Sequence, residues 1–262
     1  MSTTAAPATA APAAVRAVTV RTVLRSEWIK IRSIRSCLGS LIAVLVAALA
    51  ISLAVFPSIG QPEAATGEID RLFWLYYPMN FVQIAAIAFG ATAASSEFLN
   101  GALRNSLAAV PRRNLLFGAK AGIVGATALV VGVVAGFVMF FTANAFLGPY
   151  AVGIGEPGAL RSCFGAGLYL ALITLFSMGL TFLLRSAVAV LSLLIPFILI
   201  VSFVIGGVSE GAATWLPDRA GQQILFQEPL GTLGAWTGIG VTALWTAAAL
   251  LAGWWSLRRR DA

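Results

Sequence analysis

Six apolar stretches dominate the pattern of hydrophobic and polar positions along the chain. Each is about 20 residues long, the length that an α-helix needs to cross the hydrocarbon core of a bilayer. Short segments between them carry most of the charged residues. The pattern therefore predicts six transmembrane helices, at about residues 37–56, 73–96, 118–141, 163–184, 186–206 and 232–256.

Polar segments flank this apolar region at both ends of the chain. Residues 1–17 are rich in Ala, Pro and Thr; they offer little bulk for a core and are expected to form a disordered tail. Residues 258–262 are a short basic tail. Between the tails, the sequence divides into a segment over 18–36 and a six-span region over 37–257.

The segment 18–36 has the pattern of an amphipathic helix. Apolar side chains gather on one side of a helical wheel and arginines on the other, which predicts a basic helix at the cytoplasmic membrane interface. A docking helix for a protein partner is the alternative interpretation. Glu27 and Lys30 interrupt the apolar side three residues apart, close enough to pair. The positions that mark the helix are Arg21, Arg25, Glu27, Trp28, Lys30 and Arg32.

The loop between the second and third spans is charged and carries a helix signal of its own. Glu97 follows directly on the apolar stretch, and Gly101 permits a bend that bulkier residues resist. Pro111 disfavours helical backbone at Val110. This pattern predicts a short helix near 100–109 that ends at Val110.

Composition supports the membrane assignment. Of the 262 residues, 59% are hydrophobic and 10% charged, whereas soluble globular domains carry about 25% charged residues. A water-soluble fold is therefore excluded. The net charge of +7 does not indicate a nucleic-acid partner, because the basic residues lie at the ends of the apolar stretches, where retention on the cytoplasmic side favours them.

The distribution of Lys and Arg predicts the orientation. Basic residues gather in the N-terminal segment, in the loop after the second span, at the corner after the fourth span and in the C-terminal tail. Those left for the opposite side are Arg71, Arg161 and Arg219. By the positive-inside rule, both termini are expected to be cytoplasmic.

Missing residue types narrow the chemistry. The six expected spans contain no Asp, Glu or His, which ion-coupled transporters usually need, and Lys120 is expected to snorkel from the margin of its span. Neither Lys30 nor Lys120 follows a glycine, as the lysine of a phosphate-binding loop would. Cys37 and Cys163 fall near opposite membrane faces, so no disulfide is expected. We expect no metal, cofactor or ATP site in the chain, and energy supplied by a separate protein.

Glycine, proline and polar residues predict local features in and between the spans. Gly132-x-x-x-Gly136 favours close helix contacts, and Pro196 predicts a kink in the fifth span. The segment 207–231 is long for a connector and fits either short external or re-entrant helices or a plain loop. Three side chains of the second span are candidates for lining a substrate path, with interhelical hydrogen bonding as the alternative: Tyr76, Asn80 and Gln83.

Three segments together resemble one bacterial family. The segment from Leu24 to Ser36, the loop from Glu97 through Arg113 to Lys120, and the ending from Leu257 to Ala262 are similar to bacterial ABC-2 type exporter permeases, the transmembrane subunits of ABC transporters, as found in high-GC bacteria. The resemblance covers about residues 20–262. The positions that match the coupling region of that family are Glu97, Gly101, Arg104, Pro111, Arg112 and Arg113.

The resemblance implies a fold and a function. The fold would be an all-α integral membrane protein with six transmembrane helices, an N-terminal amphipathic interfacial helix, and a cytoplasmic coupling helix between spans two and three. The chain would be the permease subunit of an ATP-driven exporter in the bacterial cytoplasmic membrane. It would pair with a second permease, identical or related, and with separate ABC ATPase subunits that hold ATP and Mg. The resemblance leaves the cargo open.

Two other functions fit the same sequence. A secondary transporter or channel working alone would keep its activity without any ATPase. A non-transporting membrane anchor or sensor would recruit an ATPase without stimulating its turnover. Activity measured with and without an ATPase therefore distinguishes the three functions.

The orientation predicts which positions a membrane-impermeant thiol reagent reaches in intact cells. Single cysteines placed within 60–70 or 210–228 should be labelled from outside, and cysteines within 105–113 should not, because the basic loop stays in the cytoplasm. External labelling of Arg112→Cys would contradict the predicted topology.

Overall fold

The computed structural model describes residues 19–67, 69–99, 101–110, 112–229 and 232–259. Within these ranges the secondary structure is helical, with no strand. Six helices are long and apolar enough to cross a membrane. The expectation of an all-α protein with six membrane-spanning helices is confirmed at this level. The tail 1–17, Pro111 and Arg260 to Ala262 lie outside the described residues.

The helices follow one another in the order of the expected spans. The long helices are α2 (Arg35–Thr66), α4 (Met79–Ser95), α6 (Arg113–Leu147), α7 (Ala159–Leu184), α8 (Ala187–Pro196), which continues through the π-helical turn η3 (Phe197–Val201) into α9 (Ser202–Val208), and α12 (Ala235–Arg259). The short ones are α1 (Val20–Ser33), α3 (Arg71–Leu75), η1 (Ser96–Phe98), α5 (Ala102–Ala109), η2 (Gly148–Tyr150), α10 (Glu210–Ala213), α11 (Pro217–Gln222) and η4 (Gln223–Leu225).

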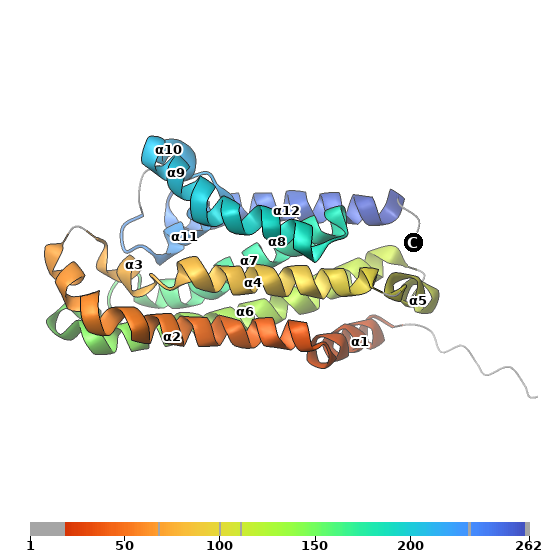
Figure 1. The fold of residues 1–262 in the computed structure, drawn as a ribbon, viewed down its shortest axis with the longest axis horizontal. Helices are drawn as coiled ribbons and strands as arrows, with labels where there is room; N and C mark the ends of the chain where they lie inside the picture. The colour runs from red at the N-terminus through yellow and green to blue at the C-terminus, as the bar shows by residue number, and fades with distance from the viewer. Residues whose placement is uncertain (1–18, 68, 100, 111, 230–231, 260–262) are drawn as a thin grey trace, which may run out of the picture.

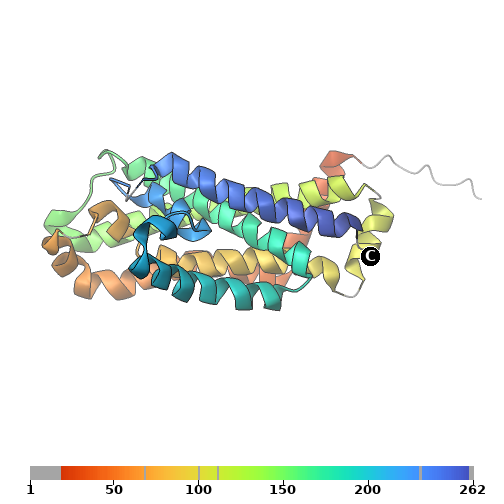
Figure 2. The ribbon, with the colours of Figure 1, turned by 90° about the horizontal axis from the view of Figure 1, so that it is seen from above.

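The long helices run side by side along one axis (Figures 1 and 2). α7 lies in the middle of the bundle and packs against α4, α6 and α12. α2 packs on α4 and α6, whereas α12 packs on α7 and α11. One end of the bundle holds α1, α5 and the C-terminal end of α12, and we call it the α1–α5 end (Figure 1). The opposite end holds α3 and α10 and is the α3–α10 end.

The second span differs from the expected continuous helix over 73–96. α3 ends at Leu75, a turn follows, and α4 begins at Met79. Pro78 causes the interruption, because proline has no N–H to donate and disfavours helical backbone at the residue before it. The same span also continues to Phe98 and so includes Glu97, which corrects the expectation that the spans contain no acidic residue.

α2 and α6 are longer than the apolar stretches that predicted them. α2 runs to Thr66 instead of 56, through Pro57 and Pro62, and α6 spans Arg113–Leu147 instead of 118–141. The two extensions support one another: the Gln61 side chain donates to the backbone carbonyl of Phe146 at 3.1 Å. Hydrophobicity indicates how much helix the bilayer covers, whereas α2 and α6 end at the C-caps Gly67 and Gly148, which both have a positive φ.

The fifth span changes geometry where the sequence indicated. α8 ends at Pro196, and the π-helical turn η3 follows at once, since proline leaves a carbonyl of the preceding turn without its usual donor. Beyond α9, the segment expected to be helical or a loop forms α10, α11 and η4. α11 is largely buried against α12.

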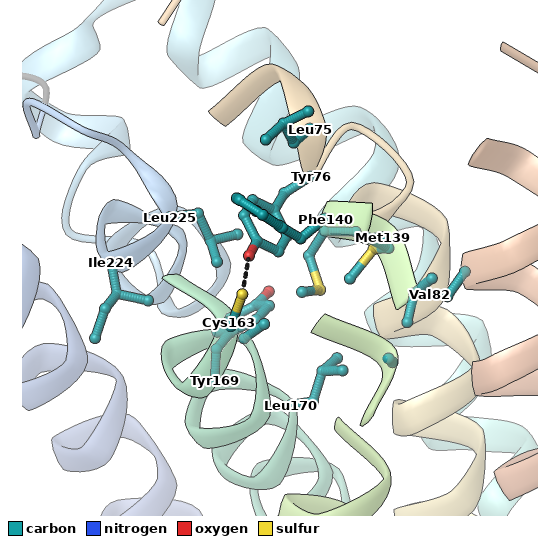
Figure 3. Packing of buried hydrophobic residues seen from close by; sticks show 14 of the residues in the cluster. Leu75, Tyr76, Val82, Met139, Phe140, Cys163, Tyr169, Leu170, Ile224 and Leu225 are labelled. Atoms are coloured by element: carbon teal, nitrogen blue, oxygen red, sulfur yellow. Dashed lines mark hydrogen bonds between the residues drawn. The ribbon is translucent and has the colours of Figure 1, made fainter. Parts of the chain in front are cut away.

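Glycine allows α7 to approach its neighbours closely. A Cβ built on Gly136 would lie 2.5 Å from the backbone oxygen of Cys163, and one on Gly132 would lie 2.9 Å from Gly167 Cα. The close contact expected from the Gly132-x-x-x-Gly136 pattern is therefore confirmed, with α7 as the partner. Toward the α3–α10 end, large side chains fill the core around Cys163, including Tyr76 and Leu170 (Figure 3). Cys163 is a free thiol, as is Cys37.

Replacing glycine at this contact should destabilise the bundle. Gly136→Ala should lower the free energy of unfolding by about 1–3 kcal/mol, because the new methyl group overlaps the α7 backbone. Gly122→Ala is the matched control, since the same helix has open space at Gly122. Thermal unfolding in detergent measures both variants, and equal stability of the two would contradict the close contact.

Candidate functional site

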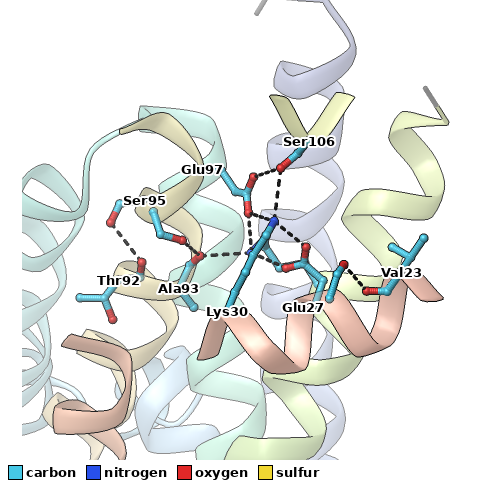
Figure 4. A network of polar contacts seen from close by, with 11 residues as sticks. Val23, Glu27, Lys30, Thr92, Ala93, Ser95, Glu97 and Ser106 are labelled. Carbon is cyan, nitrogen blue, oxygen red and sulfur yellow. Dashed lines mark hydrogen bonds and ion pairs between the residues drawn. The ribbon is translucent and has the colours of Figure 1, made fainter. Parts of the chain in front are cut away.

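A cluster of buried charges lies at the α1–α5 end, and we call it the charge cluster. Its members come from three separate segments of the chain, which are α1, the stretch from η1 to α5, and α6, and they meet inside the protein (Figure 4). Two carboxylates and two ammonium groups form it, with one hydroxyl beside them: Glu27 and Lys30 of α1, Glu97 of η1, Lys120 of α6, and Ser106 of α5.

The local sequence explains how α1 presents its part of the cluster. Thr19 caps the helix, since its side chain accepts a hydrogen bond from the Thr22 backbone N–H. Val23, Glu27 and Ile31 recur every four residues and are the buried positions of α1, so the side of the helix that is apolar on a helical wheel faces the protein. Glu27 therefore points into the protein, one turn away from the buried side chains of Val23 and Ile31.

The loop after α4 presents the second carboxylate. η1 extends α4 by one tight turn, and Glu97 points inward from it. The chain then reverses at Gly101, whose φ of +71° favours glycine. α5 ends at Ala109 with Val110 as its C-cap, where the sequence placed the end of a short helix. Ser106 on α5 donates to Glu97 Oε2 at 3.0 Å, which fastens this helix to the cluster.

The ion pairs of the cluster are short and shared. Lys120 Nζ lies 2.6 Å from Glu27 Oε2 and 2.9 Å from Glu97 Oε1. Lys30 Nζ lies 2.7 Å from Glu27 Oε1 and 2.7 Å from Glu97 Oε1. Each lysine thus bridges both glutamates, and the pairing of Glu27 with Lys30 expected from their spacing is confirmed. Lys120 also lies 3.5 Å from the backbone oxygen of Ala93.

Burial makes this pairing obligatory. The side chains of Glu27 and Glu97 are 2% exposed and that of Lys120 is 4% exposed, whereas Lys30 keeps 33%. Burial alone would lower the pKa of the Lys30 ammonium, but its hydrogen bonds to Glu27 and Glu97 outweigh this and raise the pKa. The cluster holds two negative and two positive charges, so its net charge is zero.

The expectation that Lys120 snorkels to the interface is wrong, because its ammonium turns into the protein toward the two carboxylates.

The structure divides the residues that the sequence assigned to coupling. Arg104 and Arg112 are exposed, whereas the Glu97 side chain is buried and has no surface to offer a partner. Arg113 donates to the backbone oxygens of Leu257 at 2.9 Å and Arg258 at 3.1 Å, which holds the end of α12 against α6. Pro111, which belongs to the same set, lies outside the described residues.

The residues assigned to the amphipathic helix divide in the same way. Glu27 and Lys30 belong to the charge cluster. The remaining four are exposed, and they are Arg21, Arg25, Trp28 and Arg32. α1 therefore has a basic outer surface, while its buried positions pack on α6 and α2.

The candidate pathway residues lie toward the other end of the bundle. The Tyr76 hydroxyl donates to Cys163 Sγ at 3.2 Å, and the Asn80 amide donates to the backbone oxygen of Tyr77 at 3.2 Å. Gln83 is buried, and its amide oxygen accepts hydrogen bonds from the Tyr169 hydroxyl and from the Gln222 amide, the latter at 3.5 Å. Tyr76 and Gln83 thus make interhelical hydrogen bonds.

Sequence reasoning missed Ser106, Gln222 and the position of Lys120. One available signal was composition: Lys30 and Lys120 are the only lysines of the chain, and both belong to the cluster. It also missed Asp218, whose carboxylate is 2% exposed and accepts from the Ser202 hydroxyl at 3.0 Å. Burial raises the pKa of Asp218, opposed by this hydrogen bond and by the neighbouring Arg219.

The charge cluster is suited to holding helices together and not to catalysis. Both carboxylates are occupied by ammonium groups, which leaves neither as a general base. Within the described residues, no three His, Cys, Asp or Glu side chains gather as a metal site requires. What the cluster does is join α1, α5 and α6 at one point.

The sequence matches no family model of known proteins, and no curated protein sequence matches it significantly.

Removing one lysine should destabilise the protein strongly. Lys120→Met leaves two buried carboxylates with a single ammonium, and the free energy of unfolding should fall by about 3–5 kcal/mol, as for other broken buried ion pairs. The double variant Lys120→Met/Glu27→Gln removes one charge of each sign and should recover part of that loss.

Chemical denaturation in detergent measures these differences, with the exposed Arg112→Ala as control, expected to change stability by less than about 0.5 kcal/mol. If Lys120→Met were as stable as the wild type, the cluster would not hold the three segments together.

Proposed function

We propose that this chain is the transmembrane permease subunit of an ATP-driven exporter. In this proposal it forms the substrate path with a second permease, identical or related, and is driven by separate ABC ATPase subunits that bind ATP and Mg. The observation that carries the proposal is the attachment of α5 to α1 and α6 through the charge cluster.

Two helices take defined roles in the proposal. α5 is the cytoplasmic coupling helix, with Arg104 on its exposed side, and α1 is the interfacial helix, with its exposed arginines at the level of anionic headgroups. Both lie at the α1–α5 end, beside the C-terminal end of α12 (Figure 1). In this proposal that end is the cytoplasmic one, which agrees with the distribution of basic residues.

The charge cluster gives a route by which movement of an ATPase reaches the membrane helices. A displacement of α5 acts on Glu97 through Ser106, and Glu97 pulls on Lys120 of α6. α6 meets α7 through glycines that bring the two backbones together, so a shift of α6 carries α7 with it. Because Glu27, Glu97 and Lys120 are buried, water does not compete for their ion pairs. In this proposal α5 moves together with the bundle.

The positions of the ionisable residues also support a permease whose energy comes from a separate ATPase. Glu97 and Lys120 lie within long helices, but each is paired within the charge cluster at the α1–α5 end. An ion-coupled transporter working alone would need such groups along its substrate path. A secondary transporter working alone is therefore the weaker alternative, and the activity measurements below distinguish a non-transporting anchor or sensor.

The exposed face of α5 gives the sharpest test. Arg104→Glu should leave expression and folding intact, because the side chain is exposed. In the complex with its cognate ATPase, the same change should reduce transport and the stimulation of ATP hydrolysis by about tenfold, as expected for the loss of one charged contact.

Arg71→Glu is the matched control, because it reverses an exposed arginine at the α3–α10 end and should behave like the wild type. Purified without an ATPase, the chain should neither transport nor hydrolyse ATP. Transport by the chain alone, or full activity of Arg104→Glu, would contradict the proposal.

A further inference from the structure

A cavity of about 410 Å³ opens at the α3–α10 end, between α9, α10 and α11, and we call it the α9–α11 cavity. Its walls combine three aromatic rings with three long polar side chains: Phe73, Phe203 and Phe226, and Arg219, Gln222 and Gln223. The volume is in the range of small-molecule sites, about 300–1,000 Å³.

Glycines on α9 and α10 leave room for this cavity. Gly206, Gly207 and Gly211 line it. A Cβ built on Gly207 or Gly211 would meet no atom within 4 Å, and one on Gly206 would meet only Ala213, at 3.9 Å. Glycine weakens a helix relative to alanine, and close packing does not require it here. These three glycines therefore add no side chain to the wall of the cavity.

The aromatic wall is held in place by polar contacts behind it. Phe73 and Phe226 stack with ring centroids 3.9 Å apart. Asp70 accepts hydrogen bonds from the backbone N–H of Phe73 and of Gln227, each at 2.9 Å. Arg161 donates to the backbone oxygens of Phe226 and of Gln227, the latter at 3.3 Å. The part of the apolar surface that Phe73 and Phe226 form is thus held in place.

The polar side of the cavity carries a positive charge. Arg219 is half-buried, and its guanidinium makes no hydrogen bond or ion pair with the side chains that the structure describes. Asp218 is not among the residues that line the cavity, and its carboxylate accepts a hydrogen bond from the Ser202 hydroxyl. A ligand in the cavity therefore meets apolar rings on one side and an arginine on the other.

The position of the cavity fits a molecule that spans water and lipid. Trp215 and Trp236 belong to the same end of the chain's bundle, and their side chains are 53% and 65% exposed. The Trp245 indole N–H donates to the backbone oxygen of Trp215 at 3.1 Å. Exposed tryptophans mark the level of membrane interfaces, where an amphiphile keeps its head in water and its chain in the bilayer.

We propose that the α9–α11 cavity binds an anionic single-chain amphiphile, with the headgroup on Arg219 and the apolar chain against Phe73, Phe203 and Phe226. A carboxylate or phosphate head suits the planar fork of an arginine. The identification of this ligand as the exporter's cargo rests on the proposed function, whereas its binding does not. Gln222 connects the cavity to Gln83 of α4, so an occupied site touches the second span.

Photolabelling of the purified chain tests binding without any ATPase. The chain is placed in nanodiscs of phosphatidylcholine and labelled with a photoactivatable fatty acid, and the labelled peptides are mapped by mass spectrometry. We expect saturable labelling of the peptides that carry Phe203 and Phe226. A photoactivatable alkylamine of the same length should not compete. Equal labelling by the amine, or labelling spread over all helices, would overturn the proposal.

Two variants remove the two halves of the site independently. Arg219→Gln should weaken binding by about tenfold or more, as for the loss of a hydrogen bond to a charged group. Gly207→Leu should block the cavity without disturbing packing, since the space around that position is open. Arg71→Gln is the control, because it removes an exposed arginine at the same end, and it should bind like the wild type. Wild-type binding by Arg219→Gln would overturn the proposal.

The source of the amphiphile is decided in the assembled complex with its ATPase. Stimulation of ATP hydrolysis by the fatty acid, lost in Gly207→Leu, would identify the ligand as cargo. Binding without stimulation, in a complex that other compounds do stimulate, would overturn the cargo assignment and identify a resident lipid of the bilayer. A complex that no compound stimulates would refute the proposed function, while the photolabelling result would stand.

Discussion

The arrangement of the α1–α5 end depends on four charged groups, of which Glu27, Glu97 and Lys120 are buried and Lys30 is partly exposed. Lys120 and Lys30 each bridge Glu27 and Glu97, and no member keeps its partners if one segment moves away. Desolvation makes isolated charges costly, so this balance acts as a constraint on α1, η1 and α6 together. Ser106 extends the same constraint to α5. A short surface helix, which would be marginal by itself, thereby gains a fixed position.

The middle of the bundle obeys a different constraint. Apolar attraction between helices is weak in lipid, where tails and side chains are equally apolar, and close backbone approach takes its place. α7 supplies this approach on several sides: Gly136 meets it from α6, Gly90 from α4 and Gly253 from α12. The helices therefore have little free space between them. In the proposed exporter, the charge cluster and the glycine contacts would act one after the other in passing on a displacement of α5.

The α3–α10 end is packed less closely than the middle of the bundle. Here glycines of α9 and α10 face open space instead of a neighbouring backbone, and the walls around that space are fixed by Asp70 and Arg161. Rigid walls around an open volume are what a binding site needs, because little ordering remains to be done when the ligand enters. The same residue type thus closes the bundle in its middle and opens it at this end.

The sequence alone determined the features that depend on local patterns. Run length and hydrophobicity identified six spans, Gly132 and Gly136 indicated a close contact, and the Pro111 signal placed a helix end at Val110. Tertiary structure decided the rest. Glu97 is separated from Lys30 by 67 positions, and no periodicity could tell that it turns inward to a shared pair instead of outward to a partner. The same holds for the cavity beside Arg219, because contacts between distant segments, rather than propensity, fix whether a side chain is buried and what it meets.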